Sequence, residues 1–517
     1  MIHHKLVQLF KSLSQKESLI FLISAAVFCL SFFAILTIAF LNATEKVPAS
    51  GGRWEEGVVG QPIFVNPLSS NDSDQDISRI IFSSLETLSS SIQKGENDDE
   101  WHVRLKEEIK WQDGEKITSD DLVFTIETIL NPESRSPLRR SFEGISVKRI
   151  SELETEFKLP APYVFFERKL KNLQIIPKHI FGNIPVSNFY LSRYLLEPVG
   201  SSYYNFASFD KREDGFITKY RLVANNQYFG KRPYINEFIF NFFQDEDELI
   251  NAYNRGLIDG FALNDFNKLN DIQIRHQVKE LRANRYYAIF INQELIPQLR
   301  DIENRRLLSQ TVNREQLVKE VFKNFALPLF GPTPENKAQK TDRKFLPEII
   351  NINLIVPDLP IFIKTAELIK NDWIKIGVNL TIKPLSAVEV QETIKNRSYE
   401  MILFGNTLSE PQDLYSFWHS SRRFYPGANL SLFRNREADN LMEKIRLEEN
   451  IEKISDDFKK LTEIITNESP AIFLYSPSYL YVHSPRLNGF SETEATTLSD
   501  RLNSVNQWYV KTVRKFK

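Results

Sequence analysis

Hydrophobic residues form one unbroken run near the start of the chain, and after it they recur only at short, regular intervals. The run covers residues 19–41 and contains no charged side chain. A helix rises about 1.5 Å per residue, so roughly 20 apolar residues cross a bilayer core of about 30 Å. The polar side chains of the run, Ser24, Ser31 and Thr37, can bond to carbonyl groups of the same helix. The pattern therefore predicts one membrane-spanning helix.

A cleaved signal sequence is the main alternative for this segment. Signal sequences have an apolar region of about 7–15 residues, which a small-x-small cleavage site follows. The apolar run is longer here, although residues 42–44 could serve as a cleavage site after it. The one cysteine, Cys29, follows Phe28 inside the run, so it does not stand where a lipid-modified cysteine would. We expect an uncleaved anchor.

The charges beside the run indicate its orientation. Lys5, Lys11 and Lys16 precede it, whereas Glu45 and Lys46 cancel each other after it. Because positive charge stays on the cytoplasmic side, we expect residues 1–18 in the cytoplasm and the main body outside the cell membrane. That body has no cysteine and therefore no disulfide, and it is too large for a single hydrophobic core. We expect two or three lobes.

After the run, apolar residues recur at helix-like and strand-like spacings, which predict alternating helices and strands. Turn-forming and polar residues indicate a tether over residues 42–51 and a loop over 90–100. Apolar residues at helical spacing predict single helices over 76–88, 305–322 and 436–467. Between residues 101 and 130 the pattern predicts a strand, a turn and a helix that Thr118 caps. The later part alternates strands and helices at lengths typical of a βαβ lobe.

The composition and the missing motifs argue against several classes of function. The 65 basic and 67 acidic residues are interspersed, so nothing indicates a nucleic-acid partner. No GxG dinucleotide loop, phosphate loop or GxSxG elbow occurs in the sequence. The histidines beyond His3 and His4 are far apart, so no helical two-histidine metal motif is present. We expect no cofactor, no metal and no catalytic residues, although a hydrolase with a dispersed triad stays open.

Six stretches of the exported body carry a resemblance to a known family. In chain order they are FVNPLSSNDSDQDISRIIFSSL, RLKEEIKWQDGEKITSDDLVFTIETI, IIPKHIF, EPVGSSYYNFASF, IENRRLLSQTVNREQLVKEVF and EPQDLYSFWHSSRRFYPGANLSLFRNREADNLMEKIR. The second is the most specific, with a strand ending in Trp-x-Asp-Gly, a turn, and a capped Asp-Asp-x-Val-Phe helix. Together they resemble the extracellular solute-binding proteins of peptide and nickel ABC transporters, which include dipeptide- and oligopeptide-binding proteins. The resemblance spans about residues 52–515.

Two features depart from the family pattern. The family commonly has Gly-Thr-Gly-Pro-Tyr where this chain has Gly-Ser-Ser-Tyr-Tyr at residues 200–204. A loop near the junction of the lobes is therefore expected to differ. A membrane helix also replaces the lipid-modified cysteine or cleaved signal that is usual in the family. Such a tether would keep a binding protein near its transporter by raising its effective concentration.

The resemblance implies an α/β fold of the two-lobed, class II periplasmic-binding-protein type, with an extra α+β domain inserted in the first lobe. The first lobe would combine residues 52–84, 198–265 and 483–515. The inserted domain would cover residues 85–197 and the second lobe residues 266–482. Crossing strands would join the lobes, and the ligand would lie in the cleft between them as they close about a hinge.

The resemblance also implies ligand-binding residues. In peptide-binding members an aspartate of the second lobe pairs with the ligand's ammonium group, and Asp413 matches that position, with Glu410 as a nearby substitute. The other interpretation of Asp413 is a helix cap before residues 414–419. Weaker ligand-binding candidates, each of which also fits an ordinary packing or turn role, are Trp418, Tyr203, Tyr204 and Asn66.

The expected function is a membrane-anchored solute-binding component of an ABC importer. Its partners would be an oligopeptide or dipeptide ligand, the permease subunits of the transporter, and the membrane through the N-terminal helix. Nickel or haem is a less favoured ligand, because His419 is the only histidine in the candidate cleft loop. A sensor or receptor of the same fold without a transporter is the alternative, and an exported hydrolase is a third. Neighbouring permease and ATPase genes would separate the first two.

Overall fold

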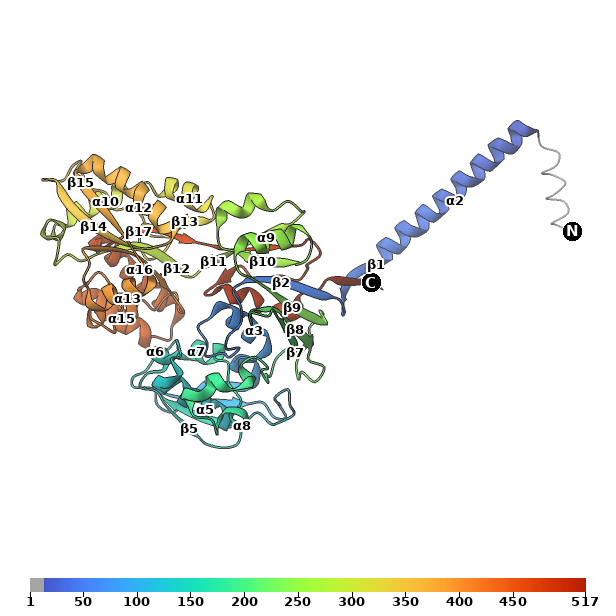
Figure 1. The fold of residues 1–517 in the computed structure, drawn as a ribbon, viewed down its shortest axis with the longest axis horizontal. Coiled ribbons are helices and arrows are strands. Elements are labelled where there is room, and N and C mark those ends of the chain that lie inside the picture. Colours follow the sequence, from blue (N-terminus) through green and yellow to red (C-terminus); the bar gives the residue numbers. More distant parts are fainter. Residues whose placement is uncertain (1–13) are drawn as a thin grey trace.

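The long apolar segment is a continuous helix in the computed structural model, which describes residues 14–517. Helix α2 (Gln15–Ala43) extends past both ends of the predicted span, and none of its residues is buried. Ser14 caps it, and the Glu17 carboxylate accepts from the Ser14 backbone in return. The helix projects away from the rest of the molecule (Figure 1). Lys5 and Lys11, which entered the prediction of orientation, lie outside the described residues.

A two-stranded ribbon follows the helix directly. Strand β1 (Thr44–Ala49) pairs antiparallel with β20 (Lys511–Phe516), and the register runs from Thr44 opposite Phe516 to Ala49 opposite Lys511. The segment expected as a tether is therefore a paired strand over most of its length. Its neighbours in sequence could not reveal this, because its hydrogen-bond partners come from the far end of the chain. Figure 1 shows the C-terminus at the base of the helix.

An eight-stranded sheet forms the first lobe. The order is β19-β11-β18-β10-β2-β9-β8-β7. Its strands are β2 (Arg53–Val59), β7 (Tyr204–Lys211), β8 (Ile217–Ala224), β9 (Glu237–Phe243), β10 (Gly260–Leu263), β11 (Gln277–Ala283), β18 (Tyr479–His483) and β19 (Glu494–Ala495). The lobe also contains α3 (Asp72–Ile81), α9 (Glu246–Asn254), and the 3-10 helices η4 (Phe266–Asp271), η8 (Leu498–Leu502) and η9 (Val505–Gln507).

A buried charge cluster joins distant segments within this lobe. The Arg501 guanidinium donates to Glu56 at 3.0 Å and to Asp76 at 2.6 Å. The Glu56 carboxylate also accepts from the Trp54 indole and from the Tyr481 hydroxyl. Arg501 and Glu56 are at most 1% exposed, so this pairing is what makes their charges tolerable in an apolar interior.

The inserted domain has a four-stranded antiparallel sheet in the order β3-β4-β6-β5. Its strands are β3 (Ser89–Lys94), β4 (Glu100–Leu105), β5 (Ser146–Arg149) and β6 (Glu154–Lys158), so β3 occupies part of the predicted loop. Its helices are α4 (Leu85–Leu88), α5 (Ser119–Leu130), α6 (Arg139–Phe142), α7 (Phe166–Asn172), α8 (Lys178–Phe181), η1 (Pro132–Ser134), η2 (Val186–Leu191) and η3 (Arg193–Leu195). Helix α5 begins after Thr118 as expected, and Asp121 completes a capping box with that residue.

The second lobe holds a six-stranded mixed sheet in the order β13-β17-β12-β16-β14-β15. The strands are β12 (Arg285–Ile291), β13 (Ala326–Pro328), β14 (Ile350–Pro357), β15 (Val378–Leu385), β16 (Met401–Thr407) and β17 (Ala471–Pro477). The helices are α10 (Ile302–Thr311), α11 (Arg314–Phe322), α12 (Pro360–Trp373), α13 (Ala387–Asn396), α14 (Tyr415–Trp418), α15 (Arg436–Leu447), α16 (Ile451–Glu468), η5 (Pro297–Arg300), η6 (Ile374–Ile376) and η7 (Ser420–Arg422).

Each of the three long predicted helices is two helices in the structure. Asn313 and Asn450 accept hydrogen bonds from the first turns of α11 and α16, so each begins a new helix inside the predicted one. Asn71 caps α3 earlier than predicted, and that helix ends at Ile81 before α4 begins. Helical spacing continues across all three breaks, and a capping asparagine marks two of them, at Asn313 and Asn450.

Two chain crossings connect the lobes. Strand β11 of the first sheet leads directly into β12 of the second, and β17 returns into β18. The crossings fall near Asn284 and Ser478. Strands β11 and β18 thus lie in the first-lobe sheet, whereas the sequence division placed residues 266–482, and with them β11 and most of β18, in the second lobe. Figure 1 shows α6 and α7 of the inserted domain lying beside α15 of the second lobe, so these two parts also meet directly.

Candidate functional site

A cavity of about 480 Å³ lies between the two lobes, beside both crossings. Three groups of residues line it. The first lobe contributes Asp72, Gln75, Leu263, Asn264, Phe266, Thr496, Thr497 and Leu498. The second lobe contributes Arg285, Tyr287, Phe322, Leu359, Ile361, Phe362, Thr407, Tyr475 and Pro477, and the return crossing contributes Ser478 and Tyr479. Its volume is in the range of ordinary small-ligand sites.

Local structure explains why these side chains meet. Arg285 and Tyr287 are two residues apart on β12, and side chains at that spacing share one face of a strand. Asp72 is the first residue of α3, which Asn71 caps, so its position is set by the start of that helix. Tyr475 and Tyr479 stand on either side of the return crossing. The site is therefore built from element ends, where the chain passes from one lobe to the other.

Arg285 is the cation of this cavity. Its guanidinium lies 4.4 Å from the ring centroid of Tyr479 and 5.7 Å from that of Tyr287. Within residues 14–517 its side chain makes no hydrogen bond and no ion pair, and its Nε atom is buried without a partner. The aromatic rings hold the planar group in place and leave its N–H donors free.

Asp72 is the carboxylate that the first lobe contributes to the cavity. Burial raises its pKa, the nearby Asp76 adds to this effect, and Arg501 opposes it. Like Arg285, it has no hydrogen-bond or ion-pair partner for its side chain in the described part of the chain. The cavity therefore places an unpaired cation on one lobe and an unpaired carboxylate on the other.

The rest of the lining is aromatic, aliphatic and hydroxylic. Tyr475 is fully buried, and its hydroxyl lies 3.1 Å from the Thr365 hydroxyl. The Tyr479 hydroxyl donates to the Thr496 carbonyl within the first lobe at 3.3 Å. No histidine or cysteine lines the cavity, and residues 14–517 contain no group of three or more side chains arranged to hold a metal ion. Such a surface can bind and orient a small ligand through charge and stacking.

Asp413 lies outside this cavity, at the contact between the inserted domain and the second lobe. Its Oδ2 atom accepts from the Tyr163 hydroxyl at 2.8 Å and lies 3.5 Å from Arg446 Nε. Its Oδ1 atom accepts from the Tyr415 backbone at 3.2 Å, close to the capping role considered above. Arg168 and Glu410 form a second bridge across the same contact, at 3.0 Å. The ammonium role of Asp413 stays a prediction.

Trp418 is fully buried in the core of the second lobe. Its indole N–H donates to the Tyr286 hydroxyl at 2.8 Å, and its ring packs against those of Phe290, Phe433 and Phe473. Trp418 is therefore a packing residue of the core, and it does not line the cavity.

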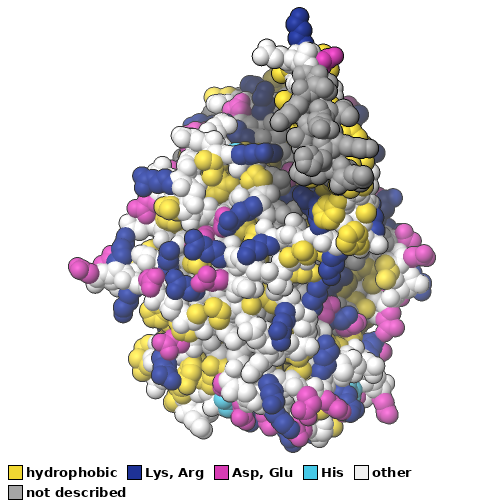
Figure 2. All heavy atoms as spheres, turned by 90° about the vertical axis from the view of Figure 1, so that its right-hand side faces the viewer, with side chains coloured by type: hydrophobic (Ala, Val, Ile, Leu, Met, Phe, Trp, Pro, Cys, Tyr) yellow, Lys and Arg dark blue, Asp and Glu magenta, His cyan; other side chains and the backbone are white. Residues whose placement is uncertain are grey.

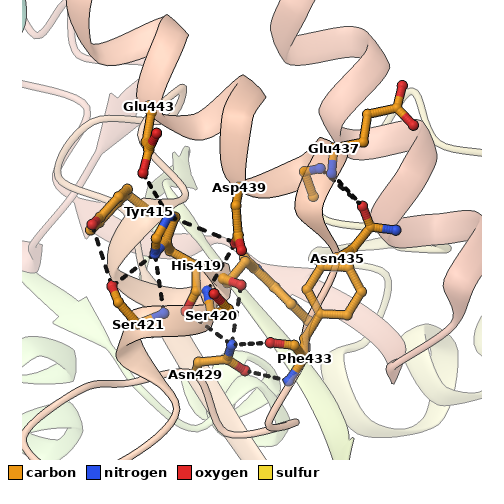
Figure 3. Close-up of polar contacts among 12 residues, drawn as sticks. Tyr415, His419, Ser420, Ser421, Asn429, Phe433, Asn435, Glu437, Asp439 and Glu443 are labelled. Carbon is orange, nitrogen blue, oxygen red and sulfur yellow. Dashed lines mark hydrogen bonds and ion pairs between the residues drawn. The ribbon is translucent and has the colours of Figure 1, made fainter.

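His419, next to Trp418, is held by contacts with neighbouring side chains of the second lobe (Figure 3). Its ring stacks on Tyr415 at 4.1 Å, and its Nδ1 atom lies 2.8 Å from the Ser421 hydroxyl. Its Nε2 atom is 3.3 Å from Glu443 and 3.8 Å from Asp439. The histidine is buried and stands away from the residues that line the cavity.

The remaining candidates lie in the first lobe. Tyr204 is fully buried, and its hydroxyl donates to the Ile235 carbonyl at 3.0 Å. Tyr203 packs against Tyr228, with ring centroids 4.9 Å apart. Asn66 accepts from the Leu68 backbone at 2.9 Å within its own turn. None of the three lines the cavity, and their assignment to ligand binding stays a prediction.

Sequence reasoning did not single out Arg285 and Asp72. Arg285 is the one charged residue of the strand RYYAIFI, and an isolated charge at the end of an apolar strand was an available signal. Asp72 is one of three aspartates in the first turns of α3, so its sequence context alone could not distinguish it from a helix-end charge. Only the fold brings it opposite Arg285.

The fold and this cleft define a two-lobed solute-binding protein. A family model, described as bacterial extracellular solute-binding proteins, family 5, middle region, matches residues 87–348. The chain belongs to this family, which is one of binding proteins and not of enzymes.

A curated relative and two solved structures agree. The oligopeptide-binding protein AppA of Bacillus subtilis is 24% identical over 496 residues, which cover 86% of this chain and 89% of AppA. Its structure with a nonapeptide covers 90% of this chain and all of that one, with a TM-score of 0.68 and 22% identity. The structure of NikZ from Campylobacter jejuni with Ni(L-His) covers 88% of this chain and 99% of its own, with a TM-score of 0.68 and 20% identity. The expected family and fold class are thus confirmed.

Proposed function

We propose that the chain is the membrane-anchored, extracytoplasmic solute-binding component of an ABC importer, and that it binds peptides in the cavity between its lobes. The observation that carries the ligand class is the pair of unpaired charges on opposite walls, Arg285 and Asp72. A free peptide has a carboxylate at one end and an ammonium at the other, which matches that pair. AppA, which is similar over most of this chain, is an oligopeptide-binding protein.

In this proposal Arg285 binds the peptide carboxylate. A guanidinium offers several N–H donors in one plane, which suits the two oxygens of a carboxylate. Tyr479 and Tyr287 contact the guanidinium and reduce its freedom before the ligand arrives, so less order is lost on binding. Asp72 receives the ammonium from the other lobe, and closure strengthens both pairs by excluding water.

The proposed location rests on α2. This helix is long and apolar enough to cross a membrane, and it lies close to the N-terminus. A signal sequence passes the same test, but an apolar run of this length favours an anchor. We propose that it stays uncleaved, that its N-terminal end is cytoplasmic, and that the two-lobed body delivers its ligand to permease subunits in the same membrane.

Peptide binding is tested with the full chain in lipid nanodiscs. A panel of di- to hexapeptides is added and the melting temperature of the body is followed, because a ligand of the native state stabilises it by mass action. We expect a rise with peptides that have free ends. A panel without any shift, together with no heat of binding in calorimetry, would overturn the peptide proposal.

The role of Arg285 has its own test. Because a hydrogen bond to a charged group contributes about 1.5–3 kcal/mol, Arg285→Gln should weaken free-acid peptides roughly 10- to 100-fold. The same peptides with an amidated C-terminus should bind wild type and variant alike. Arg282→Gln is the matched control, since this exposed arginine of β11 pairs with Glu494 outside the cavity.

A further inference from the structure

The ribbon of β1 and β20 is attached to the outer end of α2. Phe40, in the last turn of the helix, contacts the Phe516 ring at 6.2 Å and the Arg514 guanidinium at 5.9 Å. Arg514 also donates to the Thr44 hydroxyl at 2.9 Å, and the Lys517 backbone donates to the Ala43 carbonyl at 3.0 Å. The last strand of the chain is therefore held at the point where the helix leaves the membrane.

The ribbon is strongly basic. Its two strands and the residue after them carry one acidic side chain, Glu45, against five basic ones: Lys46, Lys511, Arg514, Lys515 and Lys517. The exposed Lys231 and Arg232 lie on the loop before Tyr234, whose carbonyl accepts from the Gly51 backbone at the end of the ribbon. Figure 2, which views the end of the molecule that bears the helix, shows Lys and Arg side chains spread over that face.

The ribbon also has apolar side chains with no core to bury them. Phe516 is 76% exposed and Val513 is 47% exposed, and Val513 stands directly opposite Val47 in the register. An isolated two-stranded ribbon is at best marginally stable in water. These strands pair only with each other, so another surface is needed to cover them.

We propose that the β1–β20 ribbon rests on the outer leaflet and binds anionic phospholipid headgroups, so that it seats the body on the membrane. Its basic side chains contact lipid phosphates, and Val513, which shares one face of β20 with Lys511 and Lys515, enters the boundary between headgroups and acyl chains. This inference rests on the membrane anchor in the proposed function. Continuity with α2 favours lipid as the occupant, because the ribbon begins at the residue after the helix ends.

This basic surface does not conflict with the orientation of the anchor. The rule that keeps positive charge inside counts residues close to the span in sequence. The basic residues of β20 lie more than 450 positions later, since Arg514 and its partner Thr44 are 470 residues apart. Folding brings them to the outer end of the helix after the helix has been inserted.

The test places a spin label on the ribbon of the full chain. In a Cys29→Ser background, a nitroxide is attached after Val513→Cys or, as control, after Val388→Cys, where the residue is 72% exposed on α13 of the second lobe. The protein is reconstituted in nanodiscs of phosphatidylcholine, or of phosphatidylcholine with phosphatidylglycerol. With the anionic lipid, position 513 should lose its accessibility to a water-soluble relaxation agent and gain accessibility to oxygen, whereas position 388 should not change.

A charge variant gives the second arm. Lys511→Gln, Lys515→Gln and Lys517→Gln together should abolish the added protection from phosphatidylglycerol. The matched control replaces the exposed Lys319, Lys344 and Lys459 of the second lobe and should leave that protection unchanged. Arg514 is kept in both variants, because it also contacts the helix end.

Three results would overturn the proposal. Equal water accessibility at positions 513 and 388 in both membranes excludes lipid contact. Protection that requires added permease makes the ribbon a protein-docking surface instead. Extraction of the chain by alkaline carbonate refutes the anchor itself, and peptide binding is measured independently of that result. A retained chain with an unprotected ribbon refutes only the lipid contact.

Discussion

The Tyr163 hydroxyl of the inserted domain donates a hydrogen bond of 2.8 Å to Asp413 of the second lobe. The Arg446 guanidinium lies 4.6 Å from the Tyr163 ring and 3.5 Å from the same carboxylate. Together with the bridge between Arg168 and Glu410, these contacts fasten the inserted domain to the second lobe on the side away from the crossings. They hold these two parts of the molecule against each other.

Asp413→Asn tests the two roles of this carboxylate. Because its oxygens already have partners in the structure, we expect the variant to weaken peptide binding roughly tenfold by loosening closure. The loss should be equal for peptides with free and with acetylated N-termini, and Tyr163→Phe should reproduce it. Calorimetry with both peptide forms measures this. A loss confined to peptides with a free ammonium would instead establish the role implied by the family resemblance.

Asp72→Asn should remove the preference for a free ammonium. The variant should bind free-amine peptides roughly 10- to 100-fold more weakly and acetylated peptides with unchanged affinity. The pKa of Asp72 is raised, so wild-type affinity for free-amine peptides should fall in mildly acidic buffer as this carboxylate takes up a proton. The variant should lose that pH dependence. Asp210→Asn, an exposed aspartate of β7, is the control; an equal effect there would refute the assignment.

Arg501→Met should destabilise the first lobe. It leaves two buried carboxylates, Glu56 and Asp76, without their cation, and breaking a buried pair in this way costs about 3–5 kcal/mol. Denaturant unfolding of the full chain measures the loss. Arg53→Met breaks a pair whose arginine is largely exposed, and Glu55 keeps the hydrogen bond from the Asn241 amide, so the unfolding free energy should change by less than about 1 kcal/mol. Similar losses in the two variants would contradict the buried cluster.

Lys169 gives a pH dependence of stability. Burial lowers its pKa from 10.5 to about 8, Asp413 and Glu410 oppose the shift, and Arg446 adds to it. The folded protein therefore binds fewer protons than the unfolded chain between these two pH values. The free energy of unfolding should rise with pH across that window, by roughly 3 kcal/mol for this group. Below the window, the destabilisation caused by the buried charged lysine should be constant.

Lys169→Met isolates this contribution. The difference in unfolding free energy between wild type and variant should narrow as the pH rises from 8 to 10.5. Lys171→Met, on the same helix, where the lysine is partly exposed and pairs with Glu167, should follow the wild-type curve with a constant offset. Parallel curves for wild type and Lys169→Met would show that the lysine is not desolvated.

The sequence predicted the fold well where local patterns determine it. The long N-terminal apolar helix, the strand–turn–helix segment capped at Thr118, and the alternating second lobe follow from apolar spacing and capping residues. The ribbon could not be predicted from local patterns, because β1 and β20 are short and their pairing joins segments from the two ends of the chain. Local periodicity contains no information on such a partner.

The candidate site was harder to predict for the same reason. Arg285 and Asp72 are more than 200 positions apart and belong to different lobes, so no motif contains both. Trp418 was considered because tryptophans often line ligand sites, but its indole is satisfied by Tyr286 in the core. Electrostatic complementarity across a cleft becomes visible only after the lobes are placed.

The pairing of Glu56 with Arg501 has a consequence for the order of folding. These residues are 445 positions apart, and β18 and β19 of the same sheet also come from the last part of the chain. The second-lobe sheet, by contrast, uses one continuous segment, residues 285–477. Contacts between distant residues form slowly because a long loop must close first. The first lobe begins the exported body and is completed last, after the second lobe already has every strand it needs.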